Sequence, residues 1–173
     1  MLGTPQNKTA HTSANEASFL SNELAFLLNA SPQTVVDWLQ SAHQRFEHEI
    51  IPKIEQDFLS LIRLLPNTPS LPVIFNLFLK FQMEMKLHME IEEQKIYPAF
   101  LSESNSGANP EVNELLHSHE GSEPFLEEII LLIERSNFSE NPFCQVLLSR
   151  LKRFEQDLRD HAWVEDYVLL LPH

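Results

Sequence analysis

Two segments of the sequence place a glutamate four residues after a histidine: His88 precedes Glu92, and His161 precedes Glu165. Residues four apart on a helix lie side by side on one face, so each imidazole and its carboxylate can bind one metal ion or two adjacent ions. A proline follows each pair after a few further residues. If these two segments are helical, each therefore presents an imidazole and a carboxylate side by side, as a metal-binding helix does.

Prolines and short breakers divide the chain into four predicted helices. Side chains able to cap a helix stand just before prolines that fit a first helical turn, as in Ser31-Pro32, Ser70-Leu71-Pro72, Asn109-Pro110 and Asn141-Pro142. The intervening connections are short enough to join antiparallel neighbours. We predict an all-α, up-down-up-down four-helix bundle with helices at about 32–65, 71–101, 110–135 and 142–171. Pro52 and Pro124 fall inside predicted helices and should kink them.

Apolar residues recur at helical spacing in each segment and define the inward faces. They are Leu39, Phe46, Ile50, Ile54 and Leu61; Ile74, Leu77, Phe81, Met85 and Ile91; Val112, Leu115, Leu126, Ile129 and Ile133; and Leu147, Leu151, Phe154, Leu158 and Val168. Six ionisable residues fall on the same lines, namely His43, His88, Glu92, His119, His161 and Glu165. By contrast, His48 lies about 140° round the helix from His43, and His117 about 200° from His119, so these two should point away.

Counting residues outward from the connections places the six inward residues near one level of the bundle. A single inward histidine is more often a core residue bound to a carbonyl or water. Four imidazoles and two carboxylates together would leave several ionisable groups in a low dielectric, at a cost of several kcal/mol per charge unless a cation lies between them. The inward lines carry no lysine or arginine. The pattern therefore predicts a metal site, and a metal-free helical interaction module is the alternative.

The ligand types narrow the choice of metal. Four nitrogens and two carboxylates exceed the four ligands of tetrahedral zinc, whereas iron and manganese accept higher coordination. Two carboxylates placed between two divalent ions would bridge them and cancel half of their charge. Two non-haem iron ions are the leading prediction.

Composition limits the other partners. A formal net charge of -13 disfavours nucleic acid and anionic membrane surfaces, and no segment is long and apolar enough to span a membrane. The single cysteine, Cys144, fits a cytoplasmic protein. We expect residues 1–30 to form an N-terminal extension, in which a disordered lead precedes an apolar segment, Phe19 to Leu28. That segment could cap the bundle or pair two protomers as a homodimer, and residues 31–173 form the bundle.

Three sequence elements together resemble one known family. They are HMEIE at 88–92 followed by EQKIYP, His119-Glu120-Gly121 before an apolar run, and HAWVE at 161–165 followed by DYVLLLP. Over about residues 31–172 the chain resembles the hemerythrin-like, or HHE cation-binding, domains, in particular the C-terminal domain of the repair-of-iron-centres proteins. The resemblance implies a di-iron site in which the two glutamates bridge and the four histidines are terminal ligands.

The resemblance implies binding of O2 or NO, or a response to redox stress, more than turnover as an enzyme. Repair of iron–sulfur clusters or iron donation is the alternative, but the paired cysteines of the repair proteins are missing here. Family members also carry a fifth histidine, at the place of Leu115 or near Leu64. Three glutamates could substitute for it, and each could equally be a solvated helix flank: Glu47, Glu84 and Glu123.

Overall fold

The fold is known from a computed structural model, which describes residues 24, 26–103 and 123–169. The described elements are the 3-10 turn η2 (Leu27–Asn29), the α-helices α3 (Pro32–Arg45), α4 (Ile51–Leu64), α5 (Ser70–Ile91), α6 (Tyr97–Glu103), α8 (Glu123–Glu134) and α9 (Pro142–Val164), and the π-helical segments η3 (Phe46–Ile50), η4 (Glu92–Ile96) and η5 (Glu165–Leu169). No strand occurs among the described residues. The predicted all-α class is confirmed.

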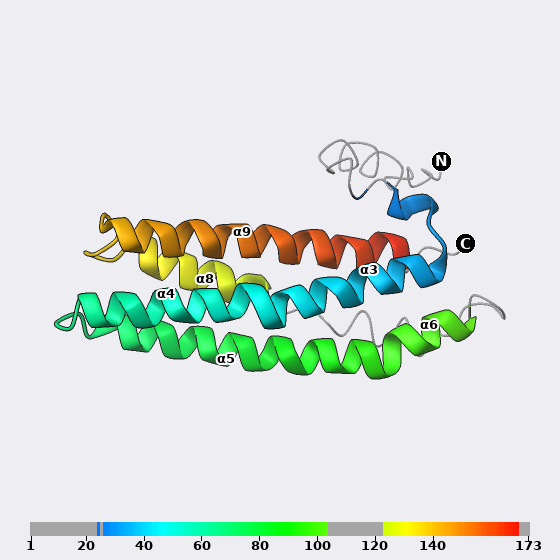
Figure 1. Cartoon of the computed structure of the whole chain (residues 1–173), viewed down its shortest axis with the longest axis horizontal. Coiled ribbons are helices and arrows are strands. Elements are labelled where there is room, and N and C mark those ends of the chain that lie inside the picture. Colours follow the sequence, from blue (N-terminus) through cyan, green and yellow to red (C-terminus); the bar gives the residue numbers. More distant parts are fainter. Residues whose placement is uncertain (1–23, 25, 104–122, 170–173) are drawn as a thin grey trace, which may run out of the picture.

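The long helices form a closed ring. Helix α4 contacts α5, α5 contacts α8, α8 contacts α9, and α9 contacts α4. Figure 1 shows these helices lying along one axis, with α3 continuing the line of α4. Of the third predicted helix, 110–135, only α8 is described; the predicted ligand His119 lies outside the described residues. The arrangement is that of the predicted four-helix bundle.

Two predicted helix starts have the expected caps. The side chain of Ser31 accepts a hydrogen bond from the backbone N–H of Thr34 at 3.2 Å, and that of Asn141 accepts one from Phe143 at 2.9 Å. In both helices a proline occupies the first turn, where its missing N–H is harmless. The prediction that Ser70 caps α5 is wrong, because Ser70 is already helical and no side-chain cap is made.

Three wide turns interrupt the helices. At η3 the backbone N–H of Ile51 bonds to the carbonyl of Phe46, and at η4 that of Tyr97 bonds to Glu92, five residues back in each case. Proline follows directly, as Pro52 and Pro98. A proline has no N–H for the carbonyl four residues back, and its ring crowds that carbonyl, so a wider turn relieves both problems. Figure 1 shows that α6 leaves the line of α5 at such a turn.

Each wide turn shifts the inward face by one residue. Ile50 was predicted on the core line, but it is only partly buried, and Ile51 takes its place at 2% exposure. Leu77 and Ile91 are also only partly buried, at the edge of the core. The other predicted core residues within the described ranges are buried. Helical periodicity was thus sufficient to predict most of the buried positions, and it failed at Ile50, which lies in a wide turn.

The buried apolar residues form two clusters. The larger one fills the space between α4, α5, α8 and α9, and the smaller one lies at the end where α3, η4 and η5 meet. Leu24 and Leu27 belong to the smaller cluster, so the described part of the N-terminal segment caps this end. Pairing of two protomers through that segment stays a prediction. No helix in the described ranges has the length and apolarity that crossing a membrane requires.

The Phe154 side chain should contribute strongly to stability. It is fully buried and meets the rings of Phe46 and Phe81 edge-on, at centroid distances of 5.4 and 6.1 Å. We expect Phe154→Ala to lower the free energy of unfolding by about 3–5 kcal/mol through lost burial and a cavity. Phe143→Ala is the control on the same helix, because Phe143 is 60% exposed. Urea unfolding of both variants measures the difference, and equal midpoints would contradict this packing.

Candidate metal centre

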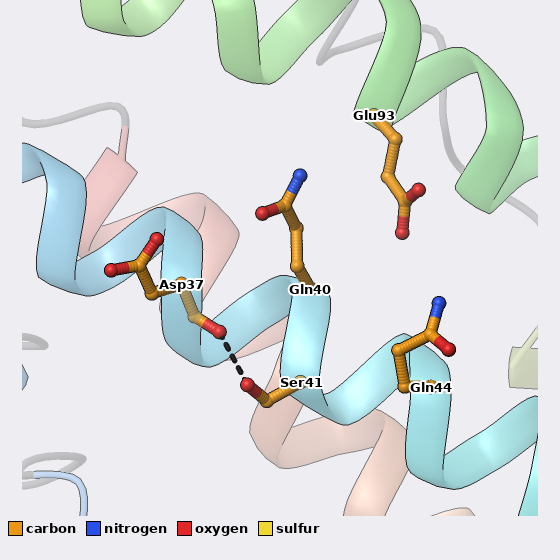
Figure 2. Close-up of a pocket in the computed structure, with 5 residues that line it drawn as sticks. All are labelled: Asp37, Gln40, Ser41, Gln44 and Glu93. Atoms are coloured by element: carbon orange, nitrogen blue, oxygen red, sulfur yellow. Dashed lines mark hydrogen bonds between the residues drawn. The ribbon is translucent and has the colours of Figure 1, made fainter.

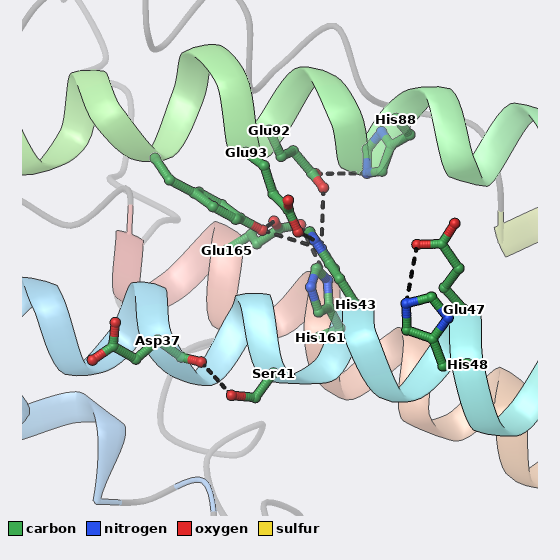
Figure 3. Close-up of polar contacts among 11 residues, drawn as sticks. Asp37, Ser41, His43, Glu47, His48, His88, Glu92, Glu93, His161 and Glu165 are labelled. Atoms are coloured by element: carbon green, nitrogen blue, oxygen red, sulfur yellow. Dashed lines mark hydrogen bonds and ion pairs between the residues drawn. The ribbon is translucent and has the colours of Figure 1, made fainter.

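Five of the six predicted ligands meet between the two apolar clusters. His43 comes from α3, His88 from α5 and His161 from α9, while Glu92 and Glu165 are the first residues of η4 and η5. His43, Glu92, His161 and Glu165 are buried, and the His88 side chain is 24% exposed. Figure 3 shows these side chains converging from the facing helices. We call the five residues the polar layer.

The ligand atoms of the polar layer are close enough to share metal ions. Nε2 of His88 lies 2.7 Å from Oε1 of Glu92, and Nε2 of His43 lies 3.4 Å from Oε2 of the same carboxylate. Nδ1 of His161 lies 3.4 Å from Oε2 of Glu165. Ligand atoms within 4.8 Å of one another form two groups of three, His43 with His161 and Glu165, and His88 with Glu92 and Glu165. The two groups share Glu165.

Several polar atoms in the polar layer are buried without a hydrogen bond. Within the described residues, neither carboxylate oxygen of Glu92 nor Nε2 of His161 has a hydrogen-bond partner. The ion pairs of Glu92 and Glu165 in that part of the chain involve histidines alone. Buried carboxylates and imidazoles normally find partners or bind metals. The unpartnered Nε2 of His161, the histidine-only ion pairs of the two carboxylates and the donor set therefore fit bound cations.

The electrostatics of the metal-free layer link its imidazoles to its carboxylates. Burial alone would lower the pKa of His43, but its contacts with Glu92 and Glu93 outweigh burial and raise that pKa above the ordinary 6.5. The pKa of His88 is raised in the same way: burial opposes the shift, and Glu92 is the main cause of it. Burial would raise the pKa of Glu92, yet His43 and His88 hold it well below its usual range. His43 and His88 therefore retain a proton more readily than free imidazoles do.

Glu93 is a residue of the site that the sequence analysis missed. Its Oε1 lies 2.9 Å from Nδ1 of His43, which leaves Nε2 of that ring for the centre of the polar layer. Its side chain is 34% exposed and lines an open polar hollow together with Asp37, Gln40, Ser41 and Gln44 of α3 (Figure 2). A carboxylate on the outer nitrogen of a ligand histidine fixes the ring and its tautomer.

Tyr97 is the second residue that was missed. Its hydroxyl donates a hydrogen bond of 2.8 Å to Oε1 of Glu165 and lies 3.3 Å from Nε2 of His43. Burial, followed by the negative charges of Glu165 and Glu92, raises the pKa of the phenol far above its usual range. At ordinary helical spacing residue 97 would lie about 140° away from residue 92. The wide turn η4 brings it back inward, and Pro98 was the available signal.

Apolar groups close the space around the polar layer. The rings of Phe46 and Trp38 lie 5.7 and 6.4 Å from that of His161. Phe81, Met85 and Leu158 are buried next to the layer, as predicted. Such a wall limits access of water and lowers the local dielectric, which controls the redox properties of a bound metal.

Two of the three additional glutamates considered as ligands, Glu47 and Glu84, do not join the polar layer. Glu47 pairs with Lys86 at 2.9 Å, and Glu84 pairs with Lys80 at 3.6 Å. The side chain of Glu123 lies outside the described residues. His48 is 63% exposed and lies beside Glu47, away from the layer, as predicted (Figure 3). Glu47 and Glu84 thus match the alternative of solvated helix flanks.

Comparison with known proteins agrees with this geometry. The model of the hemerythrin HHE cation-binding domain matches residues 34–170, which includes all six predicted ligands. No curated protein and no solved structure matches the chain.

Metal affinity should rise with pH. Histidine binds metal in its neutral form, so a bound ion must displace the protons that the raised pKa values of His43 and His88 retain. Glu92, with its lowered pKa, needs no such displacement. We therefore expect weaker binding and proton release on binding around and below the raised histidine pKa values, and tighter binding with little proton release above them. Titration of metal-free protein with Zn²⁺ in a weakly buffered indicator solution measures both, and a pH-independent affinity would contradict the assignment.

Proposed function

The chain belongs to the hemerythrin HHE cation-binding domain family, and on that basis we propose that its polar layer binds two non-haem iron ions and responds to O2, NO or redox stress. The ligands would be His43, His88, Glu92, His119, His161 and Glu165. When bound, the iron supplies electrons that can be exchanged with a diatomic ligand. The protein residues bind, orient and shield the metal.

The observation that carries this proposal is the sharing of Glu165 between two three-ligand groups. One carboxylate common to two adjacent groups is the arrangement expected for a bridge between two ions. Glu92 reaches His88 with one oxygen and His43 with the other, so it also lies between the two groups. Two divalent ions would compensate the two buried carboxylates and satisfy the atoms that lack hydrogen bonds.

The surrounding residues support reversible binding in a dry site. Glu93 holds Nδ1 of His43, so the imidazole of one ligand is oriented by an outer contact. Phe46, Phe154 and Leu158 exclude water from the same region. A site shielded in this way favours small uncharged ligands such as O2 and NO over larger polar substrates.

Iron content tests the proposal directly. Chain supplied with ferrous salt under anaerobic conditions should retain about two iron ions, and its visible spectrum should change when O2 or NO is added. His161→Ala should lose at least half of the iron because it removes a buried ligand. His48→Ala is the control, since the side chain of His48 is 63% exposed. Elemental analysis and anaerobic optical titration are the measurements.

An iron-free outcome would identify a helical interaction module instead. In that case His88→Leu combined with Glu92→Leu should leave stability equal or higher, because buried charges would give way to apolar groups. If the protein retains iron but its visible spectrum does not change with O2 or NO, the metal site is supported and the proposed response to O2 or NO is rejected.

His119 should be a ligand even though it lies outside the described residues. On the predicted third helix it faces the bundle axis, whereas His117 points away. We expect His119→Ala to reduce iron content as strongly as His161→Ala, and His117→Ala to leave it unchanged. Iron analysis of the three purified variants checks this, and equal iron loss from the variants at 117 and 119 would reject the assigned face.

A further inference from the structure

The Tyr97 hydroxyl lies among the ligand atoms of one candidate metal group. The residue is 1% exposed. Its oxygen is 2.8 Å from Oε1 of Glu165 and 3.3 Å from Nε2 of His43, and both neighbours belong to the group completed by His161. A tyrosine that merely filled the core would not need its oxygen at this point, because the smaller apolar cluster surrounds its ring.

These distances equal those between neighbouring ligands of one ion. Donor atoms about 2.1 Å from a metal and at right angles to each other are about 3 Å apart. The phenol oxygen has this spacing to two different donors, so one ion could contact all three with small side-chain movements. The hydroxyl therefore contacts a carboxylate and an imidazole of the same three-ligand group at once.

We propose that Tyr97 is a further metal ligand, and that its phenolate oxygen binds the ferric iron held by His43, His161 and Glu165. This inference rests on the proposed iron site and adds a ligand to it. It gives that iron a further protein donor, whereas Glu47 and Glu84 are paired with lysines.

The ligation step conserves atoms and electrons. The phenol O–H bond breaks, the proton leaves to solvent, and the electron pair remains on oxygen to form the bond to iron. Transfer of one electron from ferrous iron to O2 would supply the ferric state, so the tyrosine would be neither oxidised nor reduced. The phenolate charge offsets the positive charge that the iron gains, and a bound cation reverses the preference of a buried group for its neutral form.

The chain offers a matched control for the test. It contains two tyrosines, and Tyr167 is 41% exposed and stacked on Trp163 at 5.4 Å. Wild type, Tyr97→Phe and Tyr167→Phe are loaded with iron without oxygen, analysed for iron, and then oxidised in air. We expect a phenolate-to-iron charge-transfer band in the visible spectrum of wild type and Tyr167→Phe, and its complete loss in Tyr97→Phe.

Isotope labelling keeps the test decisive if Tyr97→Phe fails to fold or to bind iron. In Tyr167→Phe grown on ring-deuterated tyrosine, the sole remaining tyrosine is Tyr97, so the phenolate bands in the resonance Raman spectrum should shift. Three results would overturn the inference and leave the iron site intact. They are bound iron without the charge-transfer band, phenolate Raman bands that do not shift on labelling, and a charge-transfer band that survives Tyr97→Phe. Iron missing from all three chains would overturn the proposed function as well.

Discussion

The structure depends on keeping two carboxylates, Glu92 and Glu165, inside an apolar bundle. Each would cost several kcal/mol if it stayed ionised without positive charge nearby. Among the described residues only imidazoles form ion pairs with them, and imidazoles can balance the charge by holding protons or by binding metal alongside the carboxylates. A need for positive charge in the layer, carried by protons or by metal, follows from this one constraint. It explains why ligands from separate helices must arrive at the same level.

The frame that positions the polar layer is built independently of it. The larger apolar cluster, which joins α4, α5, α8 and α9, contains no ligand residue, so its burial does not require a metal. The smaller cluster lies on the other side of the layer and includes Tyr97 and the N-terminal Leu24 and Leu27. The layer is therefore held from both sides, and this fixes the backbone positions of its residues whether or not a cation is bound.

Sequence reasoning predicted the fold and brought together five residues of the site, for a physical reason. His43 precedes the first wide turn, and Glu92 and Glu165 each begin one. Ordinary helical spacing therefore holds up to every described ligand. At a wide turn and directly after it, that spacing fails: Ile50 was assigned to the core, and Tyr97 was overlooked. Glu93 escaped notice because its role depends on a neighbouring helix, and periodicity within one segment carries no information about such contacts.

The wide turns also determine how this chain can be compared with its relatives. Each one adds a residue between a ligand and the apolar positions that follow, and two of them precede a proline directly. In a relative without that proline, an ordinary turn would rotate everything downstream by about 100°. The ligand residues of the two sequences would still align, but a tyrosine aligned with Tyr97 would face solvent. Equivalence of ligands between two members therefore does not extend to the residues immediately after them.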